Sequence, residues 1–188
     1  PGNLPVLYPK GTGKKLYSNT DLILNIHYAP TSKKGSDQSQ VKLYFAKDPV
    51  ESEIKVMTIR ESDISNQPFY IQANTKPTFY VSYTLEEEIN MVSILPHMHF
   101  IGKSFKALAI TMEGDAIPII KIDQWDFNWQ TAYLFETPLT IPKGSVILLT
   151  ATYDNTDTNP ENPNYPSKDI SYGWNSDDEM MNFVIYYY

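Results

Sequence analysis

Two histidines separated by one residue, His97 and His99, are the side chains in this sequence best suited to binding a metal. In an extended strand, side chains at positions i and i+2 project from the same face, so both imidazoles can reach one ion. The chain has three histidines, and two of them lie in this pair. Half-buried strands also carry histidines that only form hydrogen bonds, so the pair needs support from another ligand.

A methionine late in the chain is the third candidate ligand. Met180 follows the acidic pair Asp178 and Glu179. A thioether beside two imidazoles gives a mixed nitrogen and sulfur set, which suits copper, particularly Cu(I), better than hard cations. Methionine is also a common filler of protein cores, so its strand face has to be established.

Alternation along the last expected strand separates two neighbouring methionines. Met181 falls on the apolar stripe of that strand, whereas Met180 shares its face with Asn182. The pattern therefore predicts that Met181 lies in the core and that Met180 lies on the opposite, partly polar face. A metal ligand is expected on that second face.

The same test applies to the three histidines. It places His97 and His99 together on one face of their strand, with Met98 on the reverse face. In the expected strand 21–28 the apolar side chains occupy one face and His27 the other, so His27 is predicted to face away from the core.

Other reaction types have little support in the sequence. No G-x-S-x-G motif marks a hydrolase nucleophile, and Gly11–Gly13 lacks the lysine and helix signal of a phosphate-binding loop. The adjacent acids Asp177–Glu179 could serve a glycosidase or a calcium site, but such runs more often lie in solvated turns. Asp178 and Glu179 are also close enough in sequence to Met180 to orient a ligand.

Short alternating runs of aromatic and β-branched residues, broken by Pro, Asn, Asp and Gly, indicate an antiparallel all-β fold without a helix. This number of strands on 188 residues predicts a two-sheet sandwich or a jelly roll. The expected strands are 21–28, 41–46, 69–73, 78–85, 91–100, 104–112, 145–153 and 179–187.

Composition excludes several classes of protein. A net charge of −7 argues against a nucleic-acid surface, and no apolar run approaches the length of a membrane span. The absence of cysteine removes disulfides and thiolate metal sites without indicating a compartment. The start, Pro1–Asn3, has neither an initiator methionine nor a signal peptide, so we expect a processed product or a piece of a longer protein.

Motifs along nearly the whole chain resemble one family, the copper type II, ascorbate-dependent monooxygenases, which includes peptidylglycine alpha-hydroxylating and dopamine beta-monooxygenases. The similarity is greatest to bacterial relatives. The motifs occur in family order at Pro9–Gly13, Ile26–Tyr28, Leu95–Lys103, Tyr153–Thr156, Asn159–Pro163, Gly173–Trp174 and Asp178–Met180.

The resemblance implies two tandem β-sandwich domains in the parent protein, each with one copper, of which this chain resembles the second. Residues 1–20 would be a lead-in segment from a missing N-terminal domain, and residues 21–188 the C-terminal copper-binding β-sandwich. The family's oxygen-binding copper takes two histidines and one methionine, which correspond to His97, His99 and Met180.

The family's other copper relays an electron and takes paired histidines from the first domain and a third from a His-Tyr strand. That third ligand corresponds to His27, which would be an orphan ligand because this chain has no two adjacent histidines to complete that site. The isolated chain is therefore expected to lack full activity without its partner copper domain. The resemblance also implies an extracytoplasmic location, periplasmic or secreted.

Three departures limit what the resemblance implies. Leu95 and Pro96 stand where peptidylglycine enzymes carry a carboxylate-binding arginine, so amidation of peptides is not expected. Met181 replaces a cysteine of animal members. Asn182 matches a substrate-contacting asparagine, which does not distinguish a small molecule from a peptide as substrate.

We therefore expect a copper monooxygenase domain that hydroxylates a C–H bond with O2 and a reductant such as ascorbate. A non-catalytic module that binds or transfers copper would use the same ligands. A carbohydrate-binding or adhesive module is a third reading, based on the many tyrosines and on tryptophans such as Trp125 and Trp129.

Overall fold

The computed structural model describes residues 7–24, 26, 28 and 32–188. The chain divides into two compact units, Pro1–Ile54 and Lys55–Tyr188. The boundary implied by the family resemblance falls earlier, after residue 20.

The first unit contains little regular structure in its described part. Strands β1 (Thr12–Gly13) and β2 (Ser52–Glu53) pair in parallel, and the other described residues of this unit lie in neither helix nor strand. The strands expected at 21–28 and 41–46 are therefore wrong for every residue described there. Their apolar side chains are exposed, including Leu22, Leu24 and Phe45. Alternation alone does not form a strand, because the backbone also needs a pairing partner.

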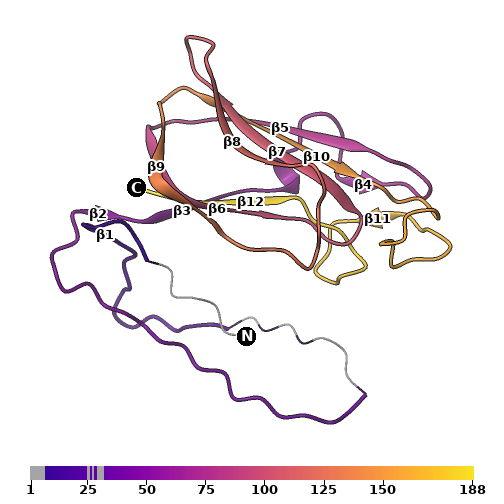
Figure 1. The fold of residues 1–188 in the computed structure, drawn as a ribbon, viewed down its shortest axis with the longest axis horizontal. Coiled ribbons are helices and arrows are strands. Elements are labelled where there is room, and N and C mark those ends of the chain that lie inside the picture. Colours follow the sequence, from indigo (N-terminus) through magenta and orange to yellow (C-terminus); the bar gives the residue numbers. More distant parts are fainter. Residues whose placement is uncertain (1–6, 25, 27, 29–31) are drawn as a thin grey trace. The chain divides into compact units, whose positions relative to one another are not determined.

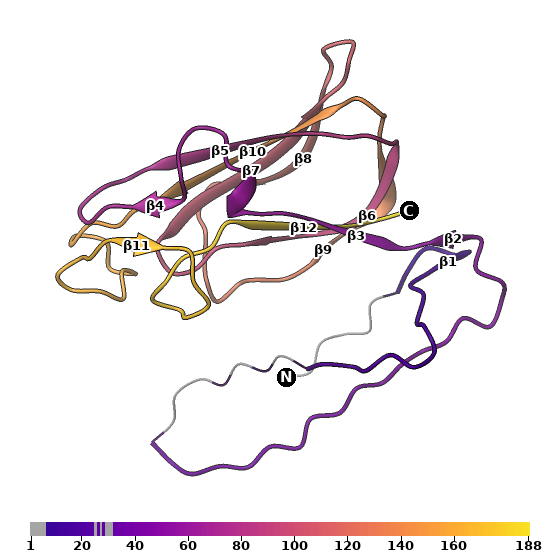
Figure 2. The same ribbon diagram turned by 180° about the vertical axis from the view of Figure 1, so that it is seen from behind.

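The second unit is built from two four-stranded antiparallel sheets (Figure 1), which Figure 2 shows from behind. One sheet has the order β5-β10-β7-β8 and the other β3-β12-β6-β9. Their bounds are β3 (Lys55–Ile59), β5 (Thr78–Thr84), β6 (Ile89–His97), β7 (Gly102–Ile110), β8 (Ala116–Ile122), β9 (Tyr133–Ile141), β10 (Val146–Tyr153) and β12 (Asn182–Tyr187).

Three short elements complete the second unit. Strands β4 (Tyr70–Ile71) and β11 (Ile170–Ser171) form a two-stranded antiparallel sheet. A single 3-10 turn, Glu61–Asp63, is the only helical element among the described residues. The expectation of an all-β chain is confirmed.

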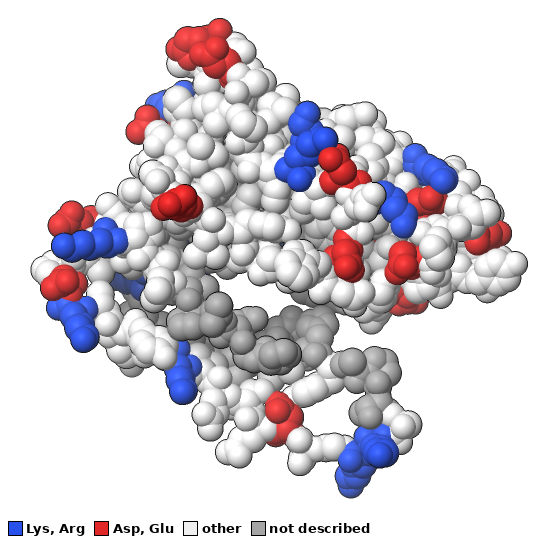
Figure 3. All heavy atoms as spheres, in the orientation of Figure 1, with Lys and Arg blue, Asp and Glu red and all other residues white. Residues whose placement is uncertain are grey.

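The core of the second unit takes side chains from both large sheets. Phe79 and Phe105 come from one sheet, and Ile94 and Phe183 from the other, and all four are buried. This confirms the antiparallel sandwich, while jelly-roll connectivity stays a prediction. Acidic and basic side chains are interspersed over the face of this unit seen in Figure 3.

Candidate metal centre

The two histidines of the pair lie side by side where strand β6 ends. β6 ends at His97, and His99 follows two residues later, outside the strand. Their ring centroids are 5.1 Å apart and the ring planes make an angle of 83°. Met98, between them, is buried in the core, and the His99 side chain is also buried, with 5% of its surface exposed.

Hydrogen bonds determine which ring nitrogen carries the proton. His97 Nδ1 contacts Gln130 Oε1, and Gln130 Nε2 donates to the Phe127 carbonyl at 2.7 Å, which sets the orientation of the Gln130 amide. His99 Nδ1 lies 3.1 Å from the Asp178 carbonyl oxygen. Both partners are carbonyl oxygens, which only accept, so each neutral ring carries its proton on Nδ1 and its lone pair on Nε2.

The strand register brings Met180 to the same face. Asn182, at the start of β12, pairs with His97 of β6. Continuing this antiparallel register places Met180 opposite His99, with both residues on the same side of the sheet as the Asn182 and His97 pair. Asn182 Nδ2 lies 3.5 Å from Met180 Sδ, a contact along that face.

Both neighbouring methionines are buried, but only one of them belongs to the core cluster. Met181 belongs to the core of the sandwich, as the alternation predicts. Met180 is only 4% exposed but lies outside that core cluster. The buried Tyr153 hydroxyl donates to the Met180 carbonyl at 2.9 Å. Burial, followed by the nearby Glu179 carboxyl, raises the pKa of Tyr153, which keeps this hydroxyl protonated.

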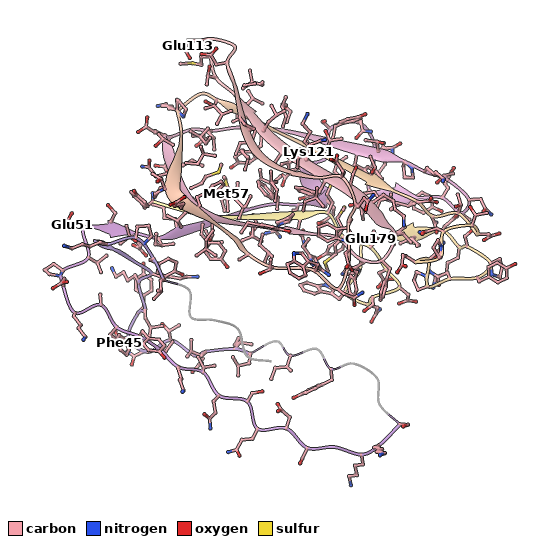
Figure 4. All side chains as sticks on the ribbon, viewed as in Figure 1. Phe45, Glu51, Met57, Glu113, Lys121 and Glu179 are labelled. Atoms are coloured by element: carbon pink, nitrogen blue, oxygen red, sulfur yellow. The ribbon has the colours of Figure 1, made fainter. Side chains whose placement is uncertain are left out.

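Glu179 is fully buried between the two ligand segments, at the place labelled in Figure 4. Its Oε1 accepts hydrogen bonds from the backbone N–H of His99 and, at 2.8 Å, from that of Met180. Burial raises the pKa of Glu179 to about 8, and the backbone N–H groups of Met180, His99 and Ile101 oppose the rise. Among the described residues its Oε2 has no hydrogen-bond partner.

Aromatic residues of the loop after β8 surround His99. Phe127 lies edge-on to the His99 ring, with centroids 6.0 Å apart, and stacks against Phe100 at 4.1 Å. The Trp125 indole donates to the His99 carbonyl at 3.2 Å. The Trp125 side chain is thus half-buried and bonded within the protein, whereas the Trp129 side chain is 71% exposed.

Sequence reasoning missed Gln130, Phe127 and Tyr153 as neighbours of the candidate ligands. No motif marks Gln130 or Phe127, and Tyr153 stands in the matching motif Tyr153–Thr156, which indicates no contact with the ligands. The contact between Glu179 and the ligands had a signal in the sequence, namely its position next to Met180. That signal did not reveal that one carboxyl oxygen bonds both ligand segments.

The donor groups fit a soft metal ion. No group of three or more His, Asp or Glu suited to a metal occurs among the residues that the structure describes. The register of β6 and β12 indicates that two imidazoles and a thioether share one face, and a donor set of this kind favours Cu(I). His27 lies outside the described residues.

Comparisons with known proteins agree with the chemistry of this donor set. A family model described as copper type II ascorbate-dependent monooxygenase, C-terminal domain, matches residues 53–188. A search of curated proteins finds no match.

Among solved structures, the crystal structure of the infectious bursal disease virus VP2 subviral particle is 14% identical, with a TM-score of 0.30. The match covers 71% of this chain and 32% of that one, so the chain spans about a third of its length. A similarity this low carries no argument about function.

Proposed function

We propose a copper-dependent monooxygenase activity for this chain, because it belongs to the copper type II ascorbate-dependent monooxygenase family and carries the family's C-terminal domain. The reaction is the hydroxylation of a substrate C–H bond, with O2 and ascorbate or another reductant as co-substrates. We propose His97, His99 and Met180 as the copper ligands. Copper at this position would supply the reduction of O2 that the hydroxylation requires.

One observation carries the proposal most directly. Both histidines carry their Nδ1 proton in a hydrogen bond to a carbonyl oxygen, and so have the lone pair on Nε2. Metal-binding histidines are commonly oriented in this way by their second nitrogen. The partners, Gln130 and Asp178, come from different loops, and each holds one imidazole.

The surrounding residues support a water-poor site. Phe127 packs edge-on against His99 and is backed by Phe100, and the Tyr153 hydroxyl donates to the Met180 carbonyl. We propose that Asn182, 3.5 Å from the Met180 thioether, contacts the substrate. Leu95 and Pro96 precede His97 where a carboxylate-binding arginine would be needed, so the substrate is a small molecule or a peptide held by other groups.

We further propose that the chain acts with an N-terminal copper domain of the same protein, to which His27 contributes a ligand. The division into a lead-in segment, 1–20, and a copper-binding domain, 21–188, stays a prediction. The family model begins at residue 53 and the second compact unit at Lys55, so residues 21–54 lie almost entirely outside that match. Bacterial-type relationship and an extracytoplasmic location are also proposals.

A membrane-spanning helix is not found in the described part of the chain. A copper-binding or copper-transfer module is the second candidate function, because the same three side chains would serve it. Coupled product formation by the parent protein with both copper domains, in the presence of copper, O2 and reductant, separates the enzyme from the transfer module. Such product formation is expected only from the enzyme.

The test of the copper site is a Cu(I) titration by competition with a chromophoric chelator. The wild-type chain should bind about one copper through two imidazoles and a thioether. The Cu(I) affinity of the double variant His97→Ala, His99→Ala should fall further than the roughly 10–100-fold loss that substitutions of residues around the ligands cause. His27→Ala is the matched control and should keep the affinity. Equal affinity in the wild type and the double variant would refute the site.

A further inference from the structure

The Glu179 side chain links the chain segments that carry His99 and Met180. The link lies beyond the last pair of residues that the sheet holds together. The last ladder pair between β12 and β6 is Asn182 with His97. His99 and Met180 both lie beyond that pair, so no strand ladder holds them together. Their backbone N–H groups instead donate to one atom, Glu179 Oε1.

We propose that Glu179 is a positioning residue that fixes the distance between His99 and Met180 for copper binding. We call the two hydrogen bonds from His99 and Met180 to Glu179 Oε1 the Glu179 bridge. This inference rests on the proposed function, since it assigns a role within the same site. It does not give Glu179 a part in the reaction itself.

The burial of the carboxyl group supports a specific role. Glu179 is 0% exposed and its Oε2 has no partner among the described residues. A buried polar atom without a hydrogen bond is unfavourable, and native proteins retain few of them. An apolar residue would avoid that penalty but would leave the His99 and Met180 amides without an acceptor.

Neighbouring contacts hold the same short segment from other sides. The Asp178 carbonyl lies 3.1 Å from His99 Nδ1, and the Tyr153 hydroxyl donates to the Met180 carbonyl at 2.9 Å. These bonds orient a ring and a carbonyl. The Glu179 bridge links the backbone of His99 to the backbone of Met180 through one oxygen atom, and so fixes the spacing that a shared metal ion requires.

The experiment compares two substitutions that differ in one property. Glu179→Gln keeps a side-chain oxygen that can accept both N–H bonds, whereas Glu179→Leu has similar size and no acceptor. Cu(I) affinity should stay within about threefold of wild type in Glu179→Gln and fall about 10–100-fold in Glu179→Leu. X-ray absorption of the Cu(I) forms should show the sulfur scatterer in wild type and Glu179→Gln, and a weakened one in Glu179→Leu.

Glu61→Leu is the matched control, because Glu61 also has a buried carboxyl oxygen without a partner but lies in the 3-10 turn. It should leave affinity and sulfur scattering unchanged. Wild-type affinity and full sulfur scattering in Glu179→Leu would overturn the proposal, as would a Glu179→Gln variant as defective as Glu179→Leu. A wild-type chain that binds no Cu(I) would instead overturn the proposed function.

Amide hydrogen exchange of the metal-free wild-type protein tests the bridge without any variant. The amides of His99 and Met180 should exchange as slowly as those of β6, although both residues lie outside the strands. Exchange at the rate of exposed turn residues would show that the bridge does not form. This measurement decides the question even if Glu179→Leu does not fold.

Discussion

Met180 and Met181 are adjacent in sequence but lie on opposite sides of one backbone. Met181 packs in the sandwich core, whereas Met180 contacts Asn182 on the face that carries the histidines. Replacing Met180 by Ile should weaken Cu(I) binding with little loss of stability, because the thioether is removed but its volume is kept. Chelator competition and thermal melts measure the two effects.

Met181→Ala is the complementary substitution. It should lower the free energy of unfolding by about 2–5 kcal/mol, the usual effect of truncating a buried methionine. Copper affinity should change little once the variant is folded. Reversed roles in the two methionine variants would mean that the strand register is off by one residue.

Gln130 determines the tautomer of His97 from a loop far away in sequence. Gln130→Leu should lower Cu(I) affinity by about tenfold, because the imidazole loses the acceptor that holds its Nδ1 proton. Gln67→Leu, at an exposed position beside a surface hollow, is the control and should have no effect. An unchanged affinity in Gln130→Leu would show that the ring is held by other contacts.

The faces of the candidate ligands could be predicted from sequence because strand alternation is a local property. The separation of Met180 from Met181 needed only the apolar pattern of the last strand. Gln130 and Tyr153 could not be found in this way, because their proximity depends on how loops and sheets pack. Glu179 was an intermediate case. Its position next to Met180 indicated a role near the site, but its hydrogen bonds with the His99 and Met180 amides could not be predicted.

At the scale of elements, six of the expected strands overlap observed strands. Strands β8 and β9 were not expected, and the expected strands of the first unit are not observed among the described residues. Both differences have physical causes. Strand β8 contains Pro118 and β9 contains Pro138, and both pair across irregular registers, so their alternation is interrupted. Both are edge strands, where proline is tolerated. The expected strands in the first unit had the pattern but, among described residues, no ladder partner.

The turn before Met180 depends on a glycine. A side chain at Gly173 would overlap the Asp178 carboxyl group, which accepts hydrogen bonds from Asn175. Gly173→Ala should therefore shift Asp178 and its carbonyl, reducing both thermal stability and Cu(I) affinity. Gly35→Ala, where an added Cβ meets nothing within 4 Å, should change neither. Equal melting temperature and affinity in both variants would contradict the predicted overlap.

The loop after β10 should be sensitive to acid. The Ser167 amide donates to Asp157 at 2.6 Å and lowers the pKa of that carboxyl below its usual 3.8. A group whose pKa is lowered by folding adds stability above 3.8, and this is lost as the pH falls through the folded-state value. The melting temperature of Asp157→Asn should therefore lie below wild type at neutral pH and approach it in acid. A constant difference would exclude this linkage.

At the scale of the whole molecule, electron supply determines whether the chain can turn over. Hydroxylating a C–H bond with O2 places one oxygen atom in the product and reduces the other to water, which takes two electrons and two protons from outside the substrate. A copper held by His97, His99 and Met180 can store only one of those electrons. A second copper would need ligands of its own, and His27 is the one remaining histidine.

We therefore expect the copper-loaded chain alone to form product far more slowly than a parent protein with both copper domains, because one imidazole gives neither chelation nor defined geometry to a second metal. The measurement is ascorbate-dependent product formation together with O2 consumption, on a substrate that the parent accepts. Oxygen uptake without product would indicate slow, uncoupled reduction at the single site. Coupled turnover at the parent's rate would show that one copper suffices, and that His27 has no role as a ligand in the reaction.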